Sequence, residues 1–223
     1  MPNPSLKVSD LFQYGTEVHF DKGDVIVQSL AQGDMDLYIL ASGVCSLSSI
    51  SSDGQETVYR YYQHHNMLNF RPLMTDMHLH SYGKKSFSVI AKTPCLAYHI
   101  NARQFEELLT FPSVISLMFE MLARNNLYLL EHFHSSKNEP ALVQLCRFLL
   151  DQATENEQGE LVLDTFFTYQ EMANYLGMHA VTVARMIKSL KCHQMIDKDG
   201  HQIHIIDPDK MAKLIVSEEK IDY

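Results

Sequence analysis

A C-terminal stretch that begins with Thr168 constrains the fold more than any other part of the chain. Thr168 lies three residues before Glu171, the spacing of a capping box that satisfies free N–H groups where a helix begins. Gly177 is expected to end that helix, and a second helix is expected over residues 179–194. The segment MIDKDGHQIHII follows and predicts a tight hairpin around residues 199–200. Helix, turn, helix and hairpin in this order predict a winged helix-turn-helix.

The second of these helices has an unusual charge pattern. Residues 177–196 contain no Asp or Glu, although the chain has 27 acidic and 18 basic residues and a formal net charge of -9. At about 100° per residue, one helix face carries apolar anchors: Val183, Met186, Ile187 and Leu190. The opposite face carries Val181, Thr182, Arg185, Lys188 and Ser189. A carboxylate on that face would repel phosphates, so the pattern favours a polyanion as partner.

In a helix-turn-helix the second helix enters the major groove of DNA. The residues expected to face DNA are His179, Ala180, Val181, Thr182, Arg185 and Lys188. Arg185 has the two-pronged geometry that suits guanine, and Val181 can contact a thymine methyl. Lys188 and Lys191 are expected to reach phosphates. An ordinary solvated helix with cations three residues apart is the alternative at this point.

The composition sets outer bounds on the class of protein. With 223 residues, of which 46% are hydrophobic and 20% charged, the chain predicts a globular protein of two modest domains. A pI near 5.7 argues against general binding to polyanions. The four cysteines have no C-x-x-C spacing and are expected to be buried, reduced thiols. No apolar leader or membrane-length run occurs, so a soluble cytoplasmic protein without a membrane partner is expected.

Residues 16 to about 100 have the pattern of a β-domain. Short runs rich in Val, Ile, Tyr and Thr alternate with glycines, which predicts a sandwich or barrel. Asp53-Gly54 predicts a tight hairpin. No GxGxxG or P-loop interrupts this region, which argues against an α/β nucleotide-binding fold.

A long helix is expected next, over residues 113–137, with Pro112 at its first position. Its apolar residues include Ile115, Met118, Phe119, Leu122, Leu129, Leu130 and Phe133. At about 37 Å it is longer than one small domain requires. Pairing with a second copy of the chain is favoured over threading through a core. The polar segment 132–140 is expected to form a hinge, and a further amphipathic helix is expected over residues 141–153.

Several segments together resemble the CRP/FNR family of transcription regulators. They are GDMDLYILASG (33–43), AKTPCLAYHI (91–100), the long helix after Pro112, and TYQEMANYLGMHAVTVARMIKSL (168–190). The spacing of LSSISSDGQETVYRYY (47–62) is most similar to PrfA-like members.

The resemblance implies an α+β chain in three parts. These are an N-terminal β-roll (double-stranded jelly-roll) effector or sensor domain over 1–111, a dimerisation helix over 112–137, and a winged helix-turn-helix DNA-binding domain over 138–223. The implied function is sequence-specific transcription regulation by a homodimer. The implied partners are double-stranded DNA with a near-palindromic operator, and RNA polymerase.

The chain departs from the family where cyclic nucleotides bind. The Gly-Glu-Leu and Arg-Ser segments of the cyclic-nucleotide cassette correspond here to Asn69-Phe70-Arg71 and Lys85-Ser86. The polar pair on the long helix corresponds to Leu129-Leu130. The effector pocket implied by the resemblance is therefore lined by Phe70, Arg71, Lys85, Ser86, Leu129 and Leu130. It lacks the ribose-binding Glu and the bidentate Arg, so cyclic AMP is not expected to bind.

The cofactor stays unassigned by the sequence. The N-terminal cysteine cluster of the iron–sulfur branch is absent. His78 and His80 have a metal-like spacing, and His64-His65 lie nearby, but surface histidines are the simpler interpretation. Haem ligation by Met or His and complete loss of the effector are further alternatives. A metal-binding β-roll protein, including a cupin-type enzyme, is the competing class, but no catalytic arrangement occurs and the chain is predicted not to be an enzyme.

Overall fold

A computed structural model describes residues 6–28, 36–54, 56–69 and 87–217. The chain forms two compact units, Met1–Asn125 and Asn126–Tyr223. The division falls inside the long helix α2 (Pro112–Asn138), so each unit contains one half of that helix.

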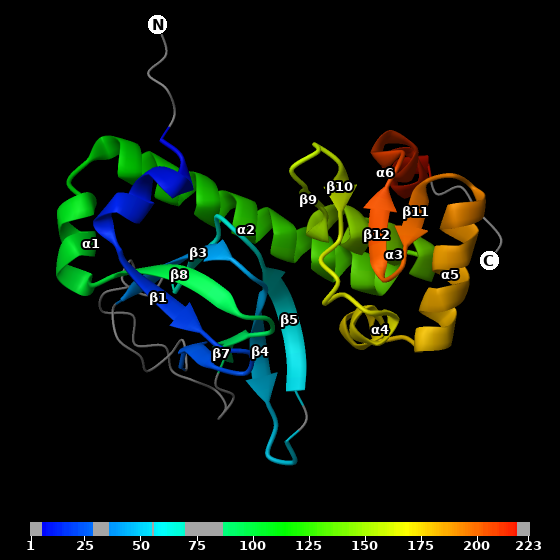
Figure 1. Ribbon diagram of the computed structural model, residues 1–223, viewed down its shortest axis with the longest axis horizontal. Coiled ribbons are helices and arrows are strands. Elements are labelled where there is room, and N and C mark those ends of the chain that lie inside the picture. The colour runs from blue at the N-terminus through cyan, green and yellow to red at the C-terminus, as the bar shows by residue number, and fades with distance from the viewer. Residues whose placement is uncertain (1–5, 29–35, 55, 70–86, 218–223) are drawn as a thin grey trace, which may run out of the picture. The chain divides into compact units, whose positions relative to one another are not determined.

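The first unit is a β-roll of two antiparallel four-stranded sheets (Figure 1). One sheet has the strand order β1-β8-β3-β6 and the other β2-β7-β4-β5. The bounds are β1 Thr16–Phe20, β2 Val25–Val27, β3 Leu37–Ser42, β4 Cys45–Ile50, β5 Glu56–Tyr62, β6 Met67–Leu68, β7 Phe87–Ala91 and β8 Cys95–Ile100. The predicted double-stranded β-roll is confirmed.

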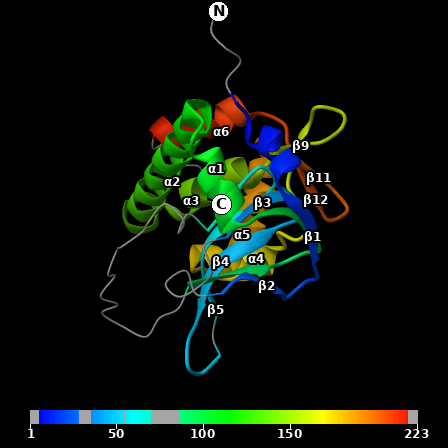
Figure 2. The same ribbon diagram turned by 90° about the vertical axis from the view of Figure 1, so that its left-hand side faces the viewer.

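Two clusters of buried side chains stabilise this unit. The first joins the two sheets, of which Figure 2 labels β1 and β3 in one and β2, β4 and β5 in the other. It includes Leu40, Leu68, Cys45 and Val89. The second lies under three helical segments and includes Leu11, Ile39, Phe105, Leu117 and Met118. The helical segments are the 3-10 helix η1 (Val8–Tyr14), α1 (Ala102–Leu108) and the first half of α2. Helix η1 was not predicted from the sequence.

Two β-roll turns that contain a glycine with positive φ differ, because an added side chain would clash at only one of them. Gly43, with φ 89°, joins β3 to β4, and an added Cβ would lie 2.4 Å from the carbonyl oxygen of Pro94. Only glycine fits there. The predicted hairpin at Asp53-Gly54 forms between β4, which ends at Ile50, and β5, which begins at Glu56, and Gly54 has φ 83°.

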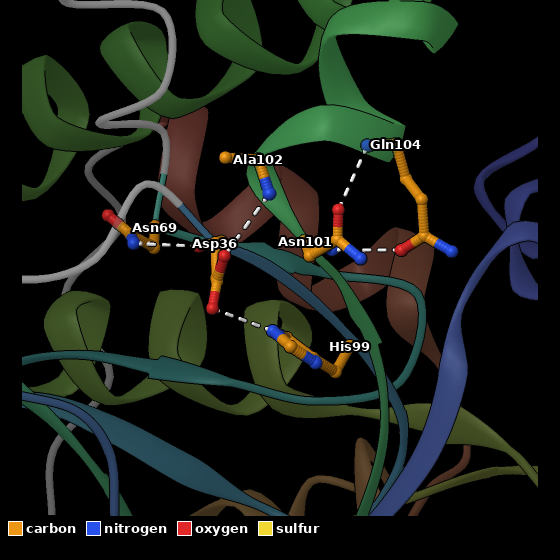
Figure 3. Close-up of polar contacts among 6 residues, drawn as sticks. All are labelled: Asp36, Asn69, His99, Asn101, Ala102 and Gln104. Carbon is orange, nitrogen blue, oxygen red and sulfur yellow. Dashed lines mark hydrogen bonds and ion pairs between the residues drawn. The ribbon is translucent and has the colours of Figure 1, made fainter.

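A polar cluster fixes the start of α1 against the β-roll (Figure 3). The carboxylate of Asp36 accepts from the backbone N–H of Ala102 at 3.2 Å and lies 2.8 Å from Nε2 of His99. Asn69 is buried at φ 68° and donates its amide to the carbonyl of Asp36 at 2.8 Å. Asn is among the residues that tolerate this left-handed backbone.

Helix α2 has 27 residues and contains no break. The predicted hinge over 132–140 is therefore wrong in its extent, because α2 continues to Asn138 and only Glu139 and Pro140 separate it from α3 (Ala141–Gln152). Pro140 cannot continue the helix, since it lacks an N–H. Arg147 on α3 donates two hydrogen bonds of 2.7 Å to Glu139, which ties the junction to α3.

The second unit combines helices with one small sheet. Its sheet has the strand order β11-β12-β10-β9. The bounds are β9 Thr154–Glu155, β10 Leu161–Val162, α4 Tyr169–Leu176, α5 Ala180–Cys192, β11 Ile196–Asp199, β12 Gln202–Ile205 and α6 Pro208–Ser217. Helix α6 was not predicted. No helix in the described ranges has the length and apolar character that a membrane span requires.

The cysteines depart from expectation at one position. Cys45, Cys95 and Cys146 are buried free thiols, as predicted, whereas Cys192 at the end of α5 is exposed. Burial raises the pKa of Cys45 and Cys95, and it raises the pKa of Cys146 to about 12.

Candidate nucleic-acid interface

The turn between α4 and α5 is built by local backbone chemistry. The hydroxyl of Thr168 accepts from the N–H of Glu171 at 3.2 Å and caps the start of α4. Gly177 ends α4 in the left-handed conformation, at φ 66° and ψ 35°, and its N–H bonds to the carbonyl of Ala173. These two residues fix the length of α4 and the direction in which α5 departs.

Helix α5 is anchored by the four apolar residues that its periodicity indicates. Val183, Met186 and Leu190 are fully buried and Ile187 is 3% exposed. Ser189 was expected on the opposite face, but it is only 8% exposed. It lies about 100° from Leu190 around the helix axis, at the border between the two faces. The prediction for Ser189 is therefore wrong, because a side chain at this border is buried together with the apolar face.

The remaining residues of the predicted face lie at the surface. Val181 is 72% exposed, a large value for an apolar side chain. His179, Arg185 and Lys188 are exposed, and Ala180 and Thr182 are half-buried. All six predicted DNA-facing residues thus have surface on α5 or at its N-cap, and their contact with DNA stays a prediction.

The three cations of α5 differ in their partners. Lys191 forms an ion pair of 2.7 Å with Asp197 on β11, and this contact raises the pKa of Lys191 and lowers that of Asp197. Among the described ion pairs, none involves Arg185 or Lys188. Lys191 is therefore partly neutralised by its own chain, while the charges of Arg185 and Lys188 face solvent.

The N-terminus of α5 has no acidic residue in its first turn, and the side chain of His179 makes no capping hydrogen bond there. The first N–H groups of a helix carry partial positive charge and suit phosphate oxygens. This end of α5 therefore adds to the positive field of Arg185 and Lys188.

A further cation, not predicted from the sequence, lies beside α4. Nζ of Lys198 on β11 is 3.1 Å from the hydroxyl of Tyr169 and 4.5 Å from the centre of its ring. Tyr169 is the first residue of α4. Because the first helix of this motif crosses the DNA backbone, Lys198 and Tyr169 are additional candidates for phosphate contact. Neither residue has a sequence signal of its own, since strand pairing brings them together.

The second half of α2 contacts α4 through aromatic side chains. The hydroxyls of Tyr128 and Tyr175 lie 2.8 Å apart, and the Tyr175 hydroxyl lies 3.5 Å from Nδ1 of His132. The rings of Tyr128 and His132 are parallel. Partial burial lowers the pKa of His132. This contact links the long helix directly to the helix that precedes α5.

The predicted effector residues are only partly described. Phe70, Arg71, Lys85 and Ser86 lie outside the described residues, as do His78 and His80. Leu129 and Leu130 lie on α2 and are 51% and 58% exposed.

The nearby pair His64 and His65 lie edge to face, with ring centres 4.9 Å apart. In the described part of the chain, no three His, Cys, Asp or Glu side chains gather in a way that would hold a metal ion.

A β-roll followed by a long helix and a helix-turn-helix unit is the architecture of one class of transcription regulators. Two family models match the corresponding parts: a cyclic nucleotide-binding domain over residues 17–110 and a Crp-like helix-turn-helix domain over residues 143–214. Together they match well over half of the chain. The chain belongs to the CRP/FNR family of transcription regulators.

A curated relative is also described as a transcription regulator. The chain is 30% identical over 125 residues to a Lacticaseibacillus casei protein described as "Probable transcriptional regulator flp"; the match spans 56% of this chain and 55% of that protein, about half of its length.

Solved structures share the fold. FixK2 from Bradyrhizobium japonicum is similar at a TM-score of 0.70 and 15% identity, over 94% of this chain and 99% of that one. A CRP/FNR regulator from Thermus thermophilus is similar at a TM-score of 0.63 and 18% identity, over 92% of this chain and 100% of that one.

Proposed function

We propose that the protein binds double-stranded DNA in a sequence-specific manner and regulates transcription as a homodimer. The observation that carries this proposal is the exposed face of α5. It combines two cations without carboxylate partners among the described ion pairs, an acid-free first turn and an exposed Val181. This combination suits the major groove, where phosphates select for cations and base edges select for individual side chains.

The exposed residues of α2 support the homodimer. Phe119 and Phe133 are 69% and 63% exposed, and Leu122 and Leu129 lie on the same face of the helix at about 100° per residue. A single copy leaves this apolar stripe in water, and a second copy of the same helix would cover it. We call this face, with Ile115, the α2 seam. Two-fold pairing through the seam would present two α5 helices to a near-palindromic operator.

The effector stays unassigned in this proposal, and cyclic AMP is not expected to serve as one. Phe70 replaces the Glu that would bind the ribose, and Leu129-Leu130 replace the polar pair that would meet the purine. A polar ligand buried without hydrogen-bond partners loses several kcal/mol. The family further suggests RNA polymerase as a partner and the cytoplasm as the location.

Selection from random double-stranded DNA, followed by fluorescence anisotropy on the selected duplex, tests the proposal. We expect an enriched two-fold symmetric motif and an affinity that falls steeply as salt is raised, because each neutralised phosphate releases counterions. Absence of an enriched motif, with binding that differs little among random duplexes, would contradict sequence-specific recognition.

A further inference from the structure

A cavity of about 620 Å³ opens on the first unit, between the residues around the start of η1, strand β5 with the turn after it, and the first half of α2. This volume lies within the range of pockets that hold small organic ligands. Of the expected effector positions that the structure describes, Asn69, Leu129 and Leu130, none lines this cavity. We call it the Arg60 cavity.

Part of the cavity wall is apolar. Leu117 is 8% exposed and belongs to the buried cluster under the helices, and Leu6, Val8 and Met121 pack against that cluster. A ligand with an apolar body would remove these side chains from water, which a bare inorganic ion could not do.

The rest of the wall is cationic. Among the described lining residues, Lys7, Arg60 and Arg124 stand beside one carboxylate, Glu120. This balance is the reverse of the whole chain, which has 27 acidic and 18 basic residues. The cavity therefore favours an anion over a cation or a neutral ligand.

Arg60 is held in place by contacts on two sides. Its Nη1 donates to Oδ1 of Asn125 on α2 at 2.7 Å, and its guanidinium lies 5.0 Å from the centre of the Tyr62 ring. A guanidinium positioned in this way has lost part of its side-chain freedom before a ligand arrives, which lowers the entropic cost of binding.

Arg124 is held less firmly. It pairs with Glu120 at 2.6 Å, but these side chains are 76% and 55% exposed. An exposed pair on one helix contributes little, so a ligand anion can replace Glu120 at Arg124.

We propose that the Arg60 cavity binds a small organic anion, with its carboxylate, sulfonate or phosphate group on Arg60 and Arg124 and its apolar body on Leu117 and Met121. Because Arg60 also holds Asn125, such a ligand acts at the contact between β5 and α2. The proposal is independent of DNA binding, and either one can fail without the other.

Two fluorescent probes with a shared aromatic body test the charge requirement in the full-length protein. Anilinonaphthalene sulfonate is anionic, and phenylnaphthylamine lacks the sulfonate. We expect Arg124→Gln to weaken the affinity for the sulfonate roughly tenfold, the loss typical of one hydrogen bond between charged groups. Affinity for phenylnaphthylamine should not change. Arg60→Gln should act in the same direction.

The matched control is Arg103→Gln on α1, whose side chain is 89% exposed and lies outside the cavity lining. It should leave both affinities unchanged. Arg124 is exposed, so its replacement leaves the fold intact and decides the question even if Arg60→Gln unfolds the β-roll. Equal sulfonate affinity in Arg124→Gln and the native chain would overturn the proposal, as would equal losses in Arg124→Gln and Arg103→Gln.

Discussion

Helices α5 and α2 both bury one face and leave the other exposed, but the exposed faces are chemically opposite. In α5 the exposed face carries Arg185 and Lys188, whereas in α2 it carries Phe119 and Phe133. The first suits a polyanion and the second suits an apolar surface. Because both helices bury an apolar face, we expect the chemistry of the exposed face to decide which class of partner each helix binds.

The largest expected effect is on the α2 seam. Replacing Leu122 and Leu129 together with Glu places charges where the second copy should pack, and an unpaired buried charge costs several kcal/mol. We expect monomers in light scattering. Leu127→Glu is the matched control: Leu127 is 60% exposed but lies roughly a third of a turn away from the seam, and this variant should stay dimeric. A double variant that remains dimeric would refute pairing through the seam.

The next largest effect is expected on DNA affinity, when two cations of α5 are replaced one at a time. Arg185→Ala should weaken binding to the selected duplex by about 1–3 kcal/mol and relax the preference for one guanine per half-site. Lys188→Ala should weaken binding to all duplexes alike and make the salt dependence less steep. Repeating the DNA selection with each variant separates the two roles. Undiminished guanine preference in Arg185→Ala would show that another residue reads the base.

A smaller effect is expected when a residue that holds α5 in place, Gly177, is compared with a residue on its exposed face, Val181. Gly177→Ala forces a side chain into the left-handed region and should lower the free energy of unfolding by roughly 1–2 kcal/mol. The surroundings do not add to this cost, since no atom lies within 4 Å of the added Cβ. Val181→Ala, at a position 72% exposed, should leave stability unchanged and reduce the preference for thymine. Urea unfolding followed by far-UV circular dichroism suits this chain, which has no tryptophan.

The smallest effect concerns pH and the contact between α2 and α4. Burial lowers the pKa of His132 below its ordinary value of 6.5. The unfolded chain therefore binds the proton more readily, and stability falls as pH drops below about 6.5. His132→Gln should reduce this loss between neutral pH and the folded-state pKa. His134→Gln, exposed on the same helix, should leave it unchanged, and identical pH profiles for all three proteins would exclude a role for His132.

Local chemistry made much of the second unit predictable. Thr168, Gly177 and the four anchors of α5 are set by capping, backbone conformation and helical period. Helix α6 also had a signal that was overlooked, because Asp207 precedes Pro208 and its carboxylate caps the N–H of Lys210 at 2.8 Å.

Tertiary contacts account for what the sequence could not predict. The Arg60 cavity draws its lining from three segments that are distant in the chain. The pairing of Lys191 with Asp197 depends on where β11 lies beside α5. The polar residues before Asn138 indicated a break, but exposed polar side chains are compatible with a helix, and only Pro140 ends it.

Cys192 is the one cysteine of the sequence that is exposed to a labelling reagent. All four cysteines of the sequence lie in the described ranges, and the other three are buried, with pKa values raised by burial. A spin label would therefore attach at the end of α5 without any substitution. In the proposed dimer, two such labels define one distance, which electron paramagnetic resonance can measure. Comparison with the roughly 34 Å turn of DNA would then give the half-site spacing from the protein alone, before any operator is known.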